Sequence, residues 1–162
     1  MLAFLKSFVY AFKGVAFGIL NERNMRVHFT CLFYMAFFLL RYDFFHVTRT
    51  QAAILALAAA IVIVAEYINT AVERTVDTAS KGEISENARI AKDTAAAAVL
   101  ISALFSVVVG IIILYQPEAF KLMFSYFASN PLSTLLFATS LVSATIFMFL
   151  PPKKYLKILR RK

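Results

Sequence analysis

Residues 65–100 read AEYINTAVERTVDTASKGEISENARIAKDTAAAAVL, a stretch in which polar side chains interrupt an otherwise apolar chain. An uncharged run at residues 50–65 enters this stretch with no Gly or Pro at the junction, which predicts one continuous helix. Four polar residues of that helix recur at i, i+3, i+7 and i+11 and share one face, here called the polar stripe: Glu66, Asn69, Glu73 and Asp77. Because an ionisable group at membrane depth costs about 2.5–3.5 kcal/mol, the stripe is a candidate functional site.

The composition is that of a membrane protein. The chain has 162 residues, of which 61% are hydrophobic, and its mean hydropathy is +0.76. These values exclude a soluble domain and leave room for several membrane spans in one unit. The single cysteine, Cys31, excludes an intramolecular disulfide, and its apolar neighbours predict a small core residue.

The hydropathy pattern on either side of the stripe predicts an all-α polytopic membrane protein. Residues 2–20 place apolar side chains on one face and Lys6 and Lys13 on another, which favours an amphipathic helix lying in the membrane interface over an inserted span. Three core spans and a fourth, C-terminal span are then expected at about 29–47, 52–77, 91–116 and 132–150. Three of these spans fall within residues 1–116, and the fourth falls within 117–162, which ends in the basic tail KKYLKILRRK.

The distribution of basic residues predicts the orientation in the membrane. Most of the 17 Lys and Arg residues fall on one side of this arrangement, and the other side holds Arg41, Arg49 and Lys121. By the positive-inside rule, both termini and the polar stripe face the cytoplasm. Topology and anionic lipid account for the net charge of +8, and no nucleic-acid partner is expected.

The polar residues near the expected cytoplasmic face suit phosphoryl transfer. Hard oxygen donors of the kind that bind Mg²⁺ are available from Glu22 and from the polar stripe. Mg²⁺ held by one or two carboxylates while it bridges phosphates is the usual arrangement in such enzymes. Lys92 is suited to offset phosphate charge, and a remaining carboxylate is suited to accept a hydroxyl proton. Walker and kinase-type glycine loops, a zinc cluster and a hydrolase elbow are all missing from the sequence.

Two other interpretations of the same residues remain open on spacing alone. A proton- or cation-coupled transporter also uses intramembrane carboxylates, although the sequence shows no broken helix and no inverted repeat. A structural cluster, in which Lys92 and Arg89 neutralise acids between packed helices, is the third interpretation.

The chain resembles the prokaryotic diacylglycerol kinase family, which also includes the undecaprenol kinases of Gram-positive bacteria. The matching elements are YAFKG at 10–14, NERN at 21–24, EYINTAVERTVD at 66–77 and AKD at 91–93. The resemblance extends over about residues 4–116, and the block at 66–77 followed by AKD is its most specific part.

This resemblance implies a small bacterial plasma-membrane kinase that acts as a homotrimer, with sites shared between subunits. It would transfer phosphate from ATP to a lipid hydroxyl with Mg²⁺. The motif around Glu22, together with His28, resembles the undecaprenol branch, which makes undecaprenol the expected acceptor and diacylglycerol the alternative.

The resemblance also implies a role for each site residue. Glu66 would be the general base on the lipid hydroxyl, and Asn69 would orient the reacting groups. Metal would be held by Glu22 and Glu73, and the nucleotide would be contacted by Lys92 and Asp93, with Asp77 in support.

Two features depart from the family pattern. The loop before Lys92 lacks the usual Glu-Tyr-His element, so Glu83 and Glu86 are the candidates for its nucleotide contacts. The fourth span and the basic tail lie outside the usual core of the family.

Overall fold

The structure is a computed structural model that describes residues 2–81, 83 and 85–151. The described residues form α-helices and no strand, which confirms the expected all-α class. In chain order the helices are α1 Leu2–Asn21, α2 Arg23–Arg41, α3 Arg49–Ala79, α4 Glu86–Leu114, α5 Pro117–Ser129 and α6 Pro131–Phe149. The basic tail expected at 153–162 lies outside the described residues.

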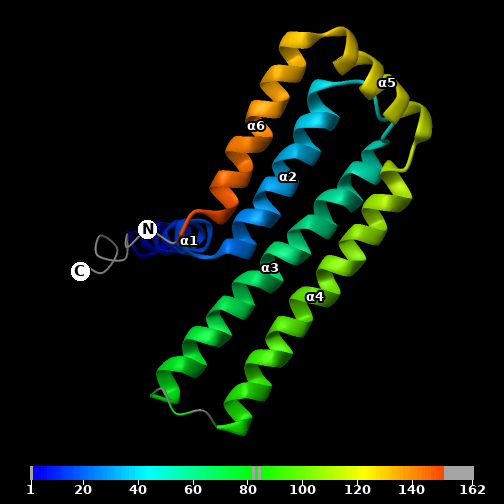
Figure 1. Ribbon diagram of the computed structural model, residues 1–162. Helices are drawn as coiled ribbons and strands as arrows, with labels where there is room; N and C mark the ends of the chain where they lie inside the picture. The colour runs from blue at the N-terminus through cyan, green and yellow to red at the C-terminus, as the bar shows by residue number, and fades with distance from the viewer. Residues whose placement is uncertain (1, 82, 84, 152–162) are drawn as a thin grey trace.

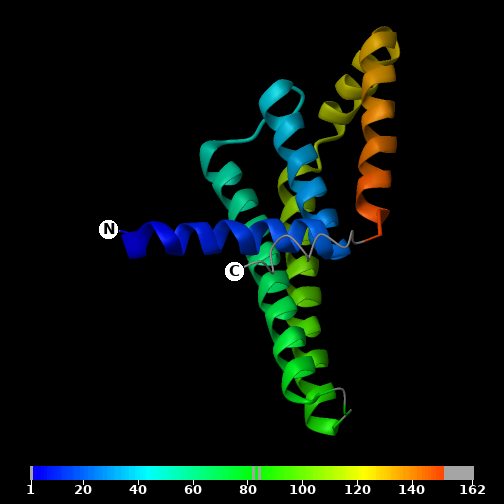
Figure 2. The same cartoon turned by 90° about the vertical axis from the view of Figure 1, so that its left-hand side faces the viewer.

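Four of the helices run side by side, and α1 lies across them. Figure 1 shows α2, α3, α4 and α6 in a slanted row, with α5 at one end of it. Turning the molecule shows α1 crossing the long axis of the others at about the level where α2 begins (Figure 2). The expectation of a separate N-terminal helix at 2–20 therefore agrees with the bounds and the crosswise placement of α1.

The helical hairpin of α3 and α4 carries the polar stripe. The continuous helix predicted across the junction at residue 65 is confirmed, since α3 has 31 residues. Its N-cap is Thr48, whose hydroxyl accepts a hydrogen bond from the Gln51 backbone N–H at 3.2 Å in a capping box. At the start of α4, the Ser85 hydroxyl accepts in the same way from the Ala88 N–H at 3.2 Å.

Three helices of the described part are long and apolar enough to cross a membrane, namely α3, α4 and α6. The span expected at 29–47 needs correction, because α2 ends at Arg41 and Tyr42 takes extended backbone angles, φ −130° and ψ 146°. The first turns of α2 also carry Arg23, Arg26 and His28, which lower its apolar content. The apolar run of the sequence does not indicate that the helix ends at Arg41.

The C-terminal helices fold back along α2. Helix α5 lies between the spans expected at 91–116 and 132–150, where the sequence analysis places no helix. Pro117 occupies its first turn, where the missing N–H has no cost. The Phe137 ring of α6 packs against Phe127 and Phe38, with centroids 5.2 and 5.4 Å apart. The Tyr34 hydroxyl donates to Ser140 Oγ at 3.0 Å. Aromatic contacts thus place α6 beside α2.

Helix α1 packs against α3 at a contact between a glycine and a tyrosine ring. The Tyr67 hydroxyl donates to the Val15 carbonyl at 2.9 Å, and a Cβ on Gly18 would lie 2.5 Å from Tyr67 Cε1. We expect Gly18→Ala to lower the free energy of unfolding by about 1–3 kcal/mol, because the ring must leave its hydrogen-bonded position. Thermal unfolding of the purified protein in detergent micelles measures this effect.

Gly14→Ala is the matched control for this substitution. It lies one turn earlier in α1, and an added Cβ there meets nothing within 4 Å. The alanine should leave stability unchanged or raise it by up to about 1 kcal/mol, because alanine favours a helix over glycine. Equal effects of the two substitutions would contradict the assigned contact with Tyr67.

Candidate functional site

Two buried oxygen atoms without partners mark the centre of the polar stripe. Glu66 is 3% exposed and Asn69 is 7% exposed. Within the described residues, Glu66 Oε2 and Asn69 Oδ1 are buried and accept no hydrogen bond. Because buried polar atoms are normally hydrogen-bonded, these two acceptors indicate a place where a donor or a cation from outside the chain would bind.

Helix α2 supplies the second wall of the site. The side chain of Asn24 faces the Glu66 carboxyl group, and Glu22 and Glu73 lie close enough to act on it electrostatically. The negative charges of Glu22 and Glu73 thus act on the buried Glu66 carboxyl group, which favours a cation or a proton there. Asn24 belongs to the NERN motif, but its contact with Glu66 depends on the packing of α2 against α3.

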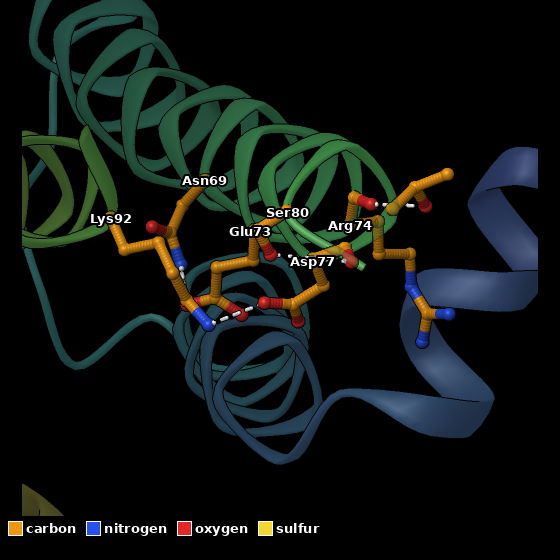
Figure 3. Close-up of polar contacts among 7 residues, drawn as sticks. Asn69, Glu73, Arg74, Asp77, Ser80 and Lys92 are labelled. Atoms are coloured by element: carbon orange, nitrogen blue, oxygen red, sulfur yellow. Dashed lines mark hydrogen bonds and ion pairs between the residues drawn. The ribbon is translucent and has the colours of Figure 1, made fainter. Parts of the chain in front are cut away.

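Further along the stripe, the polar side chains are joined to one another. Asn69 Nδ2 donates to Glu73 Oε1 at 3.0 Å, and the Lys92 ammonium lies 2.9 Å from Asp77 Oδ1. The Lys92–Asp77 pair connects α4 to α3, and Figure 3 shows Lys92 reaching across to the same side of α3 as Asn69 and Glu73. The structure therefore brings Lys92 to the polar stripe.

Arg74 is a part of the site that the sequence analysis did not single out. Its guanidinium lies 3.5 Å from Glu22 Oε1 and 4.3 Å from the centroid of the Phe17 ring. Figure 3 shows Arg74 extending away from Asn69 and Lys92, so it joins α3 to α1 and α2. Its signal in the sequence was its position as the one basic residue within 66–77.

Three predicted nucleotide contacts lie apart from this network. Glu83, Glu86 and Asp93 are exposed. Their side chains form no hydrogen bond or ion pair with the stripe in the part of the chain that the structure describes. Their roles stay predictions.

The oxygen atoms near Glu66 are suited to bind a hard cation, but the described residues of one chain do not form a complete metal site. No group of three or more His, Cys, Asp and Glu side chains within the described residues is arranged as a metal site. The two predicted ligands are already engaged, Glu22 with Arg74 and Glu73 with Asn69. The nearby side-chain atoms that could bind a metal are oxygens, including the unpartnered Glu66 Oε2. The residues therefore fit Mg²⁺ held by two carboxylates and phosphate oxygens.

A mostly apolar cavity of about 220 Å³ lies between α2, α3 and α4. Val62, one turn before Glu66, lines it together with small residues such as Ala58 and Gly110. Cys31 also lines it and is exposed, which corrects the expectation of a core cysteine. At the α2 wall, burial lowers the pKa of His28 below its usual value.

Comparison with known proteins adds a family and a relative. The family model for prokaryotic diacylglycerol kinase matches residues 9–114. A diacylglycerol kinase of Synechocystis sp. is 37% identical over 113 residues, which is 70% of this chain and 63% of the relative. The matched chain thus spans less than two thirds of that relative's length, and no solved structure matches. Helices α5 and α6 follow the part that the family model matches.

Proposed function

Because this chain belongs to the prokaryotic diacylglycerol kinase family, we propose that it is a membrane lipid kinase that transfers the γ-phosphate of ATP to a lipid hydroxyl. The observation that carries the proposal is the buried Glu66 carboxylate, with one oxygen unpartnered, between polar and apolar surroundings. In this proposal, residues 1–116 form the kinase core and residues 117–162 are an addition to it.

Glu66 is the proposed general base. Its unpartnered Oε2 is free to accept the proton of the lipid hydroxyl as the oxygen attacks phosphorus. Asn69 donates through Nδ2 to Glu73 and keeps Oδ1 free. That oxygen can accept a hydrogen bond from the same hydroxyl and so orient it.

The phosphates are proposed to lie beside Glu66 along the stripe. Glu22 and Glu73 would hold Mg²⁺, which would supply positive charge to offset that of the phosphates. Lys92 supplies a further positive charge, and Asp77 holds its ammonium group in place at 2.9 Å. Asp93, Glu83 and Glu86 are the proposed contacts to the rest of the nucleotide.

The cavity between α2, α3 and α4 is the proposed place of part of the lipid tail. Its lining is mostly apolar and begins at Val62, one turn before Glu66. The choice of undecaprenol over diacylglycerol as the acceptor rests on the resemblance of the NERN motif to the undecaprenol branch.

The enzyme is proposed to work as a homotrimer in the bacterial plasma membrane, with shared sites and both termini in the cytoplasm. The exposed alanines at 96–98 of α4 give a flat surface on which a helix of a second copy can approach closely. The one-sided distribution of Lys and Arg supports the cytoplasmic orientation.

The acceptor is tested by phosphate transfer from labelled ATP in mixed micelles that contain either undecaprenol or diacylglycerol. We expect kcat/KM to be at least about tenfold higher for undecaprenol, a difference within the range that pocket contacts supply. The Glu66→Gln variant measures the background. The reverse preference would make the protein a diacylglycerol kinase, and transfer to neither lipid by the folded protein would favour the cation-coupled transporter.

A further inference from the structure

Arg26 is a buried cation whose side chain, among the residues that the structure describes, donates to three backbone carbonyls. It is 4% exposed. Its Nη1 donates to Leu20 O at 3.1 Å, its Nε to Met148 O at 3.3 Å and its Nη2 to Leu150 O at 2.8 Å. A buried guanidinium needs such acceptors, since an unpaired buried charge is strongly unfavourable.

These carbonyls lie at the C-terminal ends of two helices. Leu20 is in the last turn of α1, while Met148 and Leu150 are at the end of α6. The last carbonyls of a helix have no partner within it and carry the negative end of its dipole. Arg26 therefore supplies hydrogen-bond donors to the C-terminal ends of both α1 and α6. Two of the three acceptors come from α6, which lies beyond the family match at 9–114.

Arg26 also forms hydrogen bonds with the backbone around Glu22. Glu22 is the one residue between α1 and α2, with extended backbone angles of φ −101° and ψ 121°. Leu20 lies two residues before it, and the Arg26 backbone N–H donates to Glu22 O at 3.3 Å one turn after it. The Arg26–Leu20 bond therefore spans the junction between α1 and α2 at which Glu22 lies.

We propose that Arg26 is a positioning residue, held in place by the C-terminal helix α6, that aims Glu22 at the metal–phosphate region. The inference rests on the proposed function, in which Glu22 is a ligand of Mg²⁺. It gives α6 a role in the reaction although no side chain of α6 reaches the polar stripe. Arg26 itself touches neither substrate nor metal.

The test uses the full chain with Arg26→Gln and Arg26→Lys. Two quantities are measured: the Mg²⁺ concentration for half-maximal lipid phosphorylation, and Mn²⁺ affinity by electron paramagnetic resonance without turnover. We expect Arg26→Gln to weaken both by about tenfold or more, the usual effect of losing a group that orients a ligand. The rate at saturating Mg²⁺ should change much less. Lysine keeps the charge but not the fork of donors, so it should rescue part of the affinity.

Tyr34→Phe is the matched control. It removes the 3.0 Å hydrogen bond from Tyr34 of α2 to Ser140 of α6 and leaves the contacts of Arg26 in place. It should leave both quantities unchanged. Unaltered Mg²⁺ and Mn²⁺ affinities in Arg26→Gln would overturn the inference even if its melting temperature falls. If that variant does not fold, unaltered affinities in Arg26→Lys would overturn it equally. A wild-type protein that phosphorylates no lipid would instead refute the proposed function.

Discussion

Glu66→Gln should slow phosphate transfer to lipid by about 10³-fold, within the range attributed to a positioned general base. The amide has nearly the shape of the carboxylate but cannot accept a proton. Glu66 Oε2 has no partner in the described chain, and the oxygen of the Gln side chain can keep the contact with Asn24. Single-turnover transfer from labelled ATP, with enzyme in excess over nucleotide, measures the chemical step apart from product release.

The matched control is Glu118→Gln, the same chemical change in an exposed carboxylate of α5 paired with Lys121 at 2.7 Å. It should leave the rate unchanged, because α5 lies at the opposite end of the molecule from the turn between α3 and α4, toward which the polar stripe runs (Figure 1). Glu66→Gln should also unfold at the same temperature as the wild type or higher, since a buried unpaired charge is removed. A Glu66→Gln protein with wild-type turnover would rule out the base.

Glu73→Gln should raise the Mg²⁺ concentration for half-maximal activity by at least about tenfold. The substitution removes one negative charge from the donor set, and Gln offers a single, weaker oxygen ligand. Glu73 accepts from Asn69 at 3.0 Å, and the Gln oxygen can keep that bond, so the fold should persist. Initial rates over a range of Mg²⁺ concentrations test the expectation, with Glu118→Gln again as the control.

Excess Mg²⁺ distinguishes a metal ligand from other roles of Glu73. If Glu73 binds the metal, high Mg²⁺ should restore part of the activity, whereas loss of a base would persist at every concentration. Full activity of Glu73→Gln at limiting Mg²⁺ would show that Glu73 is not a ligand.

Much of the site was predictable because it is local. A spacing of three or four residues places side chains on one helix face whatever the helix packs against. The stripe and its bond from Asn69 to Glu73 follow from this rule. The cap at Ser85 follows from residue type in the same way, because a serine hydroxyl accepts from the N–H three residues on.

Two kinds of structural feature were not predicted from the sequence. Some depend on a backbone choice that the apolar pattern does not report, such as the end of α2 at Arg41 and the start of α5 at Pro117. Others depend on a neighbour far away in the chain. Arg74 and Asn24 become part of the site only because α1 and α2 pack beside Glu66 and its helix.

Helical periodicity and residue chemistry were therefore enough to predict an all-α membrane protein with a polar stripe on α3. They did not place α6 against α2, and they did not reveal Arg26, whose partners at Met148 and Leu150 are 122 and 124 residues away. The physical reason is that helix formation depends on neighbours within a few residues. A buried cation, in contrast, takes whichever carbonyls the packed helices bring to it, and those are decided only when the whole chain has folded.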